Sequence, residues 1–162
     1  MPPIFHTEFR GEAKNPDGKV IQVPAALVLF QGGPRAQIAI GLAQPAAEEL
    51  VKQGLEVPSK LTGYALIDTG ASVTCVDGEA AASLHLPVVD VVNMVSASHA
   101  STRQNVYPIS LEILGAGIVV GSVMATGAEL KTQGLIALIG RDFLRFCTLH
   151  YNGVAGQFTL AV

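Results

Sequence analysis

The sequence predicts an all-β fold, either a barrel or a sandwich. Short runs of β-branched and aliphatic residues recur along the 162 residues. Turn signals made of Gly, Pro, Asn and Asp separate these runs at close spacing. Only two or three short segments have a helical composition, and they do not alternate with strands as a parallel α/β sheet requires. Short strands with close turns and few helices are typical of barrels and sandwiches.

The first third of the chain is expected to form a hairpin and a helix. Residues 1–19 are polar, and we expect a flexible N-terminal segment there with a turn at residues 15–18. Pro45 suits the first turn of a helix, and Gly54 suits its end. The elements expected after residue 19 are, in order, a strand at Val20–Phe30, a turn at Gly32–Pro34, a returning strand at Gln37–Leu42 and a helix at Pro45–Gly54.

The rest of the chain predicts further strands and two more short helices. Asp77 is expected to cap a helix, because its carboxylate can accept hydrogen bonds from the free amides of the first turn. A turn at Asn152-Gly153 predicts a closing hairpin. The expected elements are, in order, strands at Tyr64–Ile67 and Val73–Val76, a helix at Glu79–Leu84, a strand at Val88–Val95, a loop tip at Ser96–Thr102, strands at Asn105–Leu114, Ile118–Thr126 and Leu135–Ile139, a helix at Arg141–Phe146, and the hairpin strands Thr148–Tyr151 and Gln157–Val162.

Length and composition indicate one domain, spanning residues 1–162, that has apolar surface to cover. A chain of this length fits a single domain. Hydrophobic residues make up 49% of it and charged residues only 14%, so we expect a partner to cover part of the surface. The net charge is −3 and the basic residues are scattered, so we expect neither a nucleic acid nor a membrane as partner. The uncharged stretch Ile113–Ala128 is broken by glycines, which favours two strands over a spanning helix.

Cysteine and histidine usage predicts neither a metal nor a cofactor. Cys75 and Cys147 are the only cysteines, and neither has a second Cys or a His at metal-ligand spacing. We therefore expect two reduced, buried thiols. The first six residues lack the basic and apolar blocks of a signal peptide, so the expected location is the cytoplasm.

A short apolar tripeptide occurs twice, each time before a polar turn. Residues 65–67 and residues 137–139 both read Ala-Leu-Ile. The first copy leads into Asp68-Thr69-Gly70 and the second into Gly140-Arg141-Asp142. A carboxylate at the end of a buried strand is costly unless the turn supplies hydrogen bonds, a metal or an opposite charge. Asp68 is therefore the most informative residue of the chain.

Two motifs resemble those of the retropepsin-like aspartic proteases. Residues 65–72, Ala-Leu-Ile-Asp-Thr-Gly-Ala-Ser, resemble the active-site motif of that family. Residues 138–144, Leu-Ile-Gly-Arg-Asp-Phe-Leu, resemble its second motif and follow in the family's order. The strand and Ala-rich helix after the first motif look more like the cellular and bacterial branch than the viral enzymes. The resemblance implies a closed barrel of short strands with a flap hairpin and two or three short helices, completed as a C2 homodimer.

The resemblance also implies a role for each motif residue. The chain has one Asp-Thr-Gly triplet and no second Asp-Ser/Thr-Gly triplet, so a second copy must supply the other carboxylate. Two Asp68 carboxylates would then activate a water molecule as general base and general acid and cleave a peptide bond. The implied site residues are Asp68 as the catalytic group, Thr69, Gly70 and Ala71 as support of the dyad and contacts to the substrate backbone, Ser96, Ala97, Ser98, His99, Ala100 and Ser101 as the flap, and Ile139, Gly140, Arg141 and Asp142 as the scaffold of the second motif.

Departures from the family pattern leave an alternative open. The flap is rich in Ser and Ala, whereas viral flaps are rich in Gly. Ser72 stands where viral enzymes usually carry an Asp that pairs with the Arg of the second motif, so Arg141 must find another partner. The same fold can serve without catalysis. The alternative to an aspartic endopeptidase is therefore a non-catalytic dimeric module that binds peptides.

Overall fold

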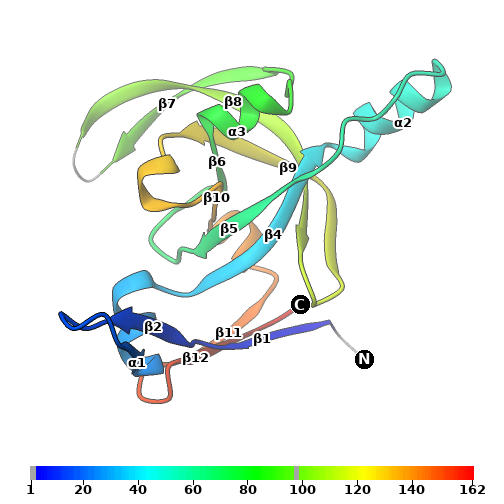
Figure 1. The fold of residues 1–162 in the computed structure, drawn as a ribbon. Coiled ribbons are helices and arrows are strands. Elements are labelled where there is room, and N and C mark those ends of the chain that lie inside the picture. Colours follow the sequence, from blue (N-terminus) through cyan, green and yellow to red (C-terminus); the bar gives the residue numbers. More distant parts are fainter. Residues whose placement is uncertain (1–2, 97–98) are drawn as a thin grey trace.

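The structure, a computed structural model, describes residues 3–96 and 99–162 and is built around a closed barrel (Figure 1). Six strands follow one another around it, and the last pairs back with the first. They are, in order, β4 (Arg35–Leu42), β5 (Leu61–Ile67), β10 (Ala137–Ile139), β6 (Cys75–Asp77), β9 (Ile118–Ala128) and β8 (His99–Ile113). Closure leaves these strands without a free sheet edge. The prediction of an all-β fold is confirmed, and the barrel is the form that it takes.

A long hairpin extends from the barrel. Strand β7 (Asp90–Ser96) pairs only with β8, whose other end belongs to the barrel (Figure 1). Ser96 pairs with His99, so the predicted loop at Ser96–Thr102 is wrong in length, and Ala97 and Ser98 lie outside the described residues. Backbone pairing satisfies the amide and carbonyl groups of this stretch, and it outweighs the small polar side chains that suggested a loop.

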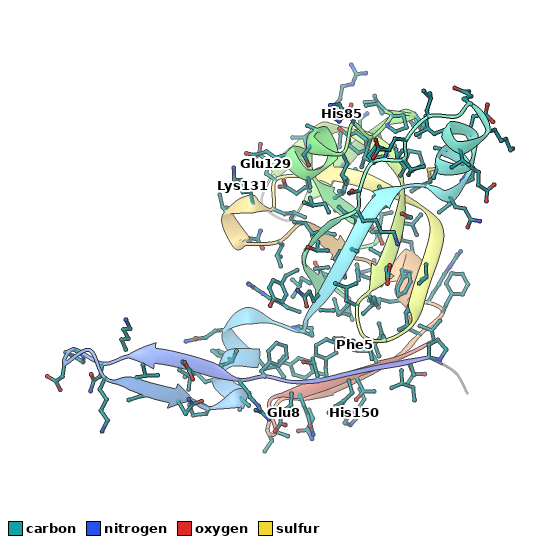
Figure 2. The ribbon with its side chains drawn as sticks, turned by 45° about the vertical axis from the view of Figure 1, so that its right-hand side comes forward. Phe5, Glu8, His85, Glu129, Lys131 and His150 are labelled. Carbon is teal, nitrogen blue, oxygen red and sulfur yellow. The ribbon has the colours of Figure 1, made fainter. Side chains whose placement is uncertain are left out.

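Both ends of the chain contribute to a second sheet. Strand β12 (Gln157–Ala161) lies between β1 (Ile4–Glu8) and β11 (Thr148–Asn152) and is antiparallel to both. Phe5 lies on the side of this sheet that faces the barrel, whereas Glu8 and His150 lie on the other side (Figure 2). The rings of Phe5 and Phe9 pack on the fully buried Phe158, with centroids 5.6 and 6.0 Å away. These aromatic contacts join the second sheet to the hydrophobic core.

The segment from Gly11 to Gly32 differs from the prediction. Strands β2 (Gly11–Lys14) and β3 (Val20–Val23) form a hairpin whose turn closes with a 2.8 Å hydrogen bond from the amide of Gly18 to the carbonyl oxygen of Asn15, as the turn prediction requires. The strand predicted at Val20–Phe30 is wrong beyond Val23, because helix α1 (Ala25–Gly32) follows Pro24. Proline lacks the amide that a continuing strand needs, and the Ala-Ala-Leu sequence after it favours a helix.

The other helices are short. They are α2 (Gln44–Lys52), α3 (Gly78–Ser83), the 3₁₀ turn η1 (Lys131–Gln133) and α4 (Arg141–Leu144). Helices α2, α3 and α4 occur close to the predicted positions, whereas the turn η1 was not predicted. Asp77 caps α3 as predicted, since its carboxylate accepts hydrogen bonds from the amides of Glu79 and Ala80. Within residues 3–96 and 99–162, no helix has both the length and the apolar content needed to cross a bilayer.

The core is mostly aliphatic and extends from the inside of the barrel to β12 of the second sheet. Each fully buried Ile or Leu contributes roughly 1.5–3 kcal/mol relative to an exposed side chain. Ala65 and Ile67 of β5 point into this core together with Ala137 and Ile139 of β10. The two copies of the repeated tripeptide are thus fixed by the best-packed part of the molecule. The largest fully buried aliphatic side chains are Leu29, Ile38, Ile40, Val76, Ile109, Leu111, Ile113, Ile139 and Leu160.

Candidate functional site

The two motifs lie side by side. Strands β5 and β10 are parallel, and the two tripeptides pair in register, with Ala65 opposite Ala137 and Ile67 opposite Ile139. The amide of Asp68 continues this ladder and donates a 2.9 Å hydrogen bond to the carbonyl oxygen of Ile139. Both chain segments therefore leave the barrel at the same end, and their polar turns meet there.

Asp68 is held by its own turn. Its Oδ1 accepts hydrogen bonds from the amides of Gly70, at 2.8 Å, and Ala71, at 3.2 Å. The side chain is half-buried, whereas Thr69 and Gly70 are exposed. A Cβ on Gly70 would lie 3.0 Å from this same oxygen, so glycine leaves room for the carboxylate. The turn thus supplies the backbone donors that a carboxylate at the end of a buried strand needs.

Arg141 binds the backbone of the first motif. Its Nη1 donates hydrogen bonds to the carbonyl oxygens of Thr69, at 2.7 Å, and Gly70, at 2.9 Å. Its own amide donates to the carbonyl oxygen of Ala71 at 3.0 Å. Arg141 therefore finds a partner without the acidic residue that Ser72 replaces. The Gly70 carbonyl, which we expected to contact substrate, keeps one lone pair for that role because each carbonyl oxygen has two.

Hydrogen bonds between Asp142 and Thr74 link the second motif to the chain that follows the first motif. The carboxylate of Asp142 accepts hydrogen bonds of 2.9 Å from both the amide and the hydroxyl of Thr74. The same hydroxyl accepts a hydrogen bond from the amide of Gly140 at 3.3 Å. Thr74 is 1% exposed, so these groups have little access to water. Sequence reasoning missed Thr74; its signal is a hydroxyl in the otherwise apolar run from Val73 to Val76.

The second motif needs glycine at position 140. A Cβ there would lie 2.4 Å from the carbonyl carbon of Val73 and 2.8 Å from the amide nitrogen of Thr74. Both are backbone atoms, which are unable to move aside as a flexible side chain would. Gly140 therefore permits the close contact between the end of β10 and the chain that follows the Asp68 turn.

Two apolar side chains, Leu66 and Leu138, lie on the strands that lead into the two turns. Leu66 and Leu138 are both half-buried and paired in register, on the opposite sheet face from Ala65 and Ile67. Cys75 pairs with Leu138 and extends this row. Burial, followed by the negative charges of Asp142 and Asp68, raises the pKa of the Cys75 thiol to about 11. Sequence reasoning did not single out Leu66 and Leu138 as site residues.

The predicted site residues fall into two groups. Asp68, Thr69, Gly70 and Ala71 contact the turn that begins at Gly140, whereas the predicted flap, from Ser96 to Ser101, belongs to the end of the β7–β8 hairpin. Ala97 and Ser98 of that flap lie outside the described residues. In the part of the chain that the structure describes, no three His, Cys, Asp or Glu side chains are placed to hold a metal ion.

The chain is similar in fold to two solved structures. One is a retropepsin-like aspartic protease from Rickettsia conorii, with 15% sequence identity, a TM-score of 0.45, and coverage of 99% of this chain and 95% of that one. The other is the retroviral protease-like domain of Ddi1 from Leishmania major, with 12% identity, a TM-score of 0.38, and coverage of 74% and 82%. Neither a protein-family model nor a curated protein matches the sequence. At such identities the chemistry of this chain must be judged from its own residues.

Proposed function

We propose that the chain is an aspartic endopeptidase that acts as a homodimer with one Asp68 from each copy. The observation that carries the proposal is the joined pair of motifs: Asp68 held by its turn amides, with Arg141 bound to the carbonyls of the same turn. The turn is exposed at one end of the barrel. This position suits a carboxylate that must contact both a second copy of the chain and a peptide.

The chemistry follows from two like charges brought close together. Two adjacent carboxylates do not both ionise readily, so the pair shares one proton. The ionised Asp68 acts as general base on a water molecule that attacks the scissile carbonyl carbon. The protonated Asp68 hydrogen-bonds the carbonyl oxygen and later returns a proton to the leaving amine. Water adds across the peptide bond, and no cofactor takes part.

Binding of the peptide is assigned to groups around the turn. The remaining lone pair of the Gly70 carbonyl accepts a hydrogen bond from a substrate amide. Leu66 and Leu138 offer an apolar surface for a substrate side chain. The β7–β8 hairpin supplies the cover that excludes water from the reaction. Thr69 links the turns of the two copies through its hydroxyl.

Replacement of Asp68 by Asn tests the proposal. The change keeps the shape of the side chain and removes its ability to act as a base. We expect cleavage of a mixed peptide library, followed by mass spectrometry, to fall by about 10³-fold or more. The matched control is Asp17→Asn, since Asp17 is exposed in the β2–β3 turn. Full cleavage by a folded Asp68→Asn protein would refute catalysis by Asp68.

The second candidate is a non-catalytic module that binds peptides as a dimer. The contact between Arg141 and the Gly70 carbonyl favours it, since this carbonyl is partly occupied before any peptide arrives. On this hypothesis, wild type and Asp68→Asn bind the same peptides with similar affinity, and neither cleaves them. Cleavage by the wild type alone decides for the endopeptidase.

A further inference from the structure

A cavity lies against the β7–β8 hairpin. Its volume is about 740 Å³, within the range of ligand-binding cavities. One wall comes from the hairpin, with Met94, Thr102 and Gln104, and another from barrel strand β9, with Gly127 and Ala128. Gly78 of α3 and Gln133 of η1 also line the cavity. None of its lining residues belongs to either motif of the candidate active site. The cavity and the Asp68 turn are therefore formed by different residues.

The described lining residues include uncharged polar side chains, which are Thr102, Gln104, Asn105, Tyr107 and Gln133. The Nδ2 of Asn105 donates a 3.1 Å hydrogen bond to the hydroxyl of Tyr107, and the Nε2 of Gln104 donates one of 3.4 Å to the hydroxyl of Thr102. These bonds use amide hydrogens and leave the amide oxygens as acceptors. The Oε1 of Gln104 faces Gly127, lying 3.7 Å from the place of a Cβ on that residue. Such a lining suits a ligand that carries several N–H donors.

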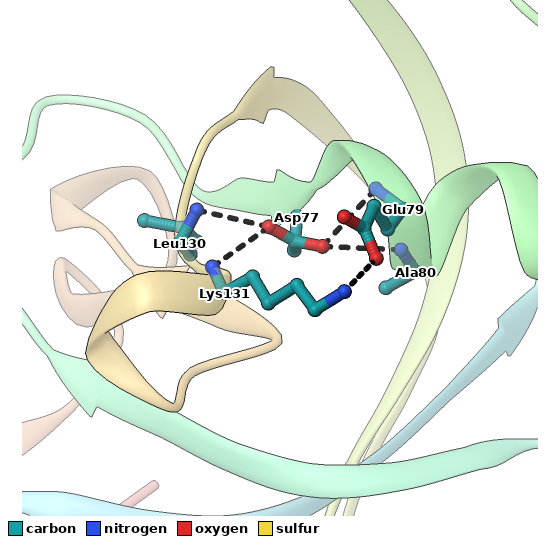
Figure 3. Close-up of polar contacts among 5 residues, drawn as sticks. All are labelled: Asp77, Glu79, Ala80, Leu130 and Lys131. Carbon is teal, nitrogen blue, oxygen red and sulfur yellow. Dashed lines mark hydrogen bonds and ion pairs between the residues drawn. The ribbon is translucent and has the colours of Figure 1, made fainter.

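The charges around the cavity favour a cation. Among the lining residues that the structure describes, Glu129 is the one that carries a charge. Figure 2 places Glu129 next to Lys131, but the ammonium of Lys131 is paired with Glu79 at 2.6 Å and does not line the cavity. Four amides at the starts of α3 and η1, those of Glu79, Ala80, Leu130 and Lys131, are occupied as well, because they donate hydrogen bonds to the two oxygens of Asp77 (Figure 3). An anion would find neither a basic side chain nor a free helix start there.

We propose that this cavity binds a basic peptide segment, with an Arg or Lys side chain directed to Glu129 and backbone amides hydrogen-bonded to the amide and hydroxyl groups of the lining. A guanidinium or ammonium group pairs with the carboxylate. Gly127 lets the lining side chains pack against β9, since a Cβ there would lie 3.4 Å from Cε2 of Tyr107 and 3.7 Å from Oε1 of Gln104 and would contact both. A bound segment contacts the hairpin and the barrel at once, so it restrains the motion of the hairpin relative to the barrel.

The test measures binding of three capped tripeptides, acetyl-Ala-Arg-Ala-amide and its Gln and Glu counterparts. The protein is the full chain with Asp68→Asn, so that cleavage does not consume the peptides and the result is independent of catalysis. The readout is the change in the amide NMR signals of Gly78 and Gly127 during titration. We expect the Arg peptide to bind about three- to fivefold more tightly than the Gln peptide, and the Glu peptide to bind most weakly.

Two variants separate the charge from the shape of the cavity. Glu129→Gln is expected to remove the preference for Arg over Gln, and Gly127→Val, which suits a strand, is expected to weaken binding of both peptides. Absence of shifts at millimolar peptide, a preference for Arg that persists in Glu129→Gln, or shifts confined to the Asp68 turn would each overturn the proposal. Agmatine, which carries a guanidinium but no amide, is expected to bind more weakly than the Arg peptide. Equal binding would overturn the assignment to a peptide.

Discussion

The carbonyl oxygen of Ile139 accepts a 2.9 Å hydrogen bond from the amide of Asp68. This bond extends the parallel pairing of β5 and β10 by one residue beyond the repeated tripeptide. The position of the Asp68 backbone is therefore set by a strand that lies about 70 residues away in sequence. Arg141 and Asp142 of the second motif add hydrogen bonds to the Asp68 turn and to Thr74.

The close contact at Gly140 predicts a strong effect of a single methyl group. In Gly140→Ala, the Cβ would lie 2.4–2.8 Å from backbone atoms of Val73 and Thr74, so β10 and the chain after Asp68 must separate. We expect a loss of about 2–4 kcal/mol in the free energy of unfolding, measured by urea titration. Gly78→Ala is the control, because a Cβ at Gly78 meets nothing closer than 3.9 Å. Equal stability of the two variants would contradict the contact.

The hydroxyl of Thr74 predicts a second effect on stability. Thr74→Val keeps the shape of the side chain but leaves the amide of Gly140 without its acceptor and removes one of the two donors to Oδ1 of Asp142, which keeps the amide of Phe143. We expect a loss of about 1–3 kcal/mol in the free energy of unfolding. Thr74→Ser restores the hydroxyl and is expected to recover most of this loss. A Val variant as stable as wild type would contradict the role of the hydroxyl.

Local sequence was sufficient for the parts of the fold that depend on neighbouring residues. The cap of α3 was predictable because Asp77 directly precedes the amides that it binds. The turn at Gly18 and the pairing of Asp68 with the amides of Gly70 and Ala71 are equally local. Composition does not distinguish helix α1 from a strand, because Val, Leu and Phe fit both, and Pro24 is the local signal for the change from strand to helix.

Contacts between residues far apart in the sequence could not be predicted from the local sequence. Strand β1 forms because β12, at the other end of the chain, offers it a pairing edge. The contact of Arg141 with the carbonyls of Thr69 and Gly70 was not predictable, since every residue has a carbonyl group and no side chain marks these two. The cavity below the hairpin likewise combines residues from five separate elements.

Removal of the Arg141 side chain should loosen the Asp68 turn. Arg141→Met loses both hydrogen bonds to the turn carbonyls while keeping most of the apolar length of the side chain. Because Arg141 is exposed, we expect a loss of only about 0.5–1.5 kcal/mol in the free energy of unfolding. Hydrogen exchange of the amides from Thr69 to Ala71 should become faster. Arg145→Met, at the C-cap of the same short helix, should leave that exchange unchanged. Acceleration in both variants would argue against a specific role of Arg141.

The Cys75 thiol predicts a loss of stability at high pH. Burial, the charge of Asp142 and the charge of Asp68 raise its pKa from 9.0 to about 11 in the folded chain. Between these values the unfolded chain has already lost the proton, so it binds fewer protons than the folded chain, and the free energy of unfolding falls as pH rises. We expect Cys75→Ala to remove on the order of 2 kcal/mol of the decline between pH 9 and 11.

Urea titrations at a series of pH values measure this decline. Cys147→Ala is the control, since burial alone raises the pKa of that thiol. It should keep most of the decline that wild type shows. Asp68→Asn should reduce the decline slightly, because it removes one of the charges that act on Cys75. An identical pH dependence of wild type and Cys75→Ala would contradict a buried thiol at this position.

Mixing of active and inactive chains tests whether each site needs two copies of Asp68. If wild type and Asp68→Asn chains are unfolded together and refolded in equal amounts, random pairing gives about a quarter wild-type dimers. A mixed dimer holds one carboxylate and one amide, so it lacks the shared proton that the proposed mechanism requires. Cleavage per total chain should therefore fall to about a quarter of the wild-type value and vary with the square of the wild-type fraction. A linear dependence, with half of the activity retained, would mean that each chain acts alone, and Asp68 would then need a different partner from the one that twofold symmetry supplies.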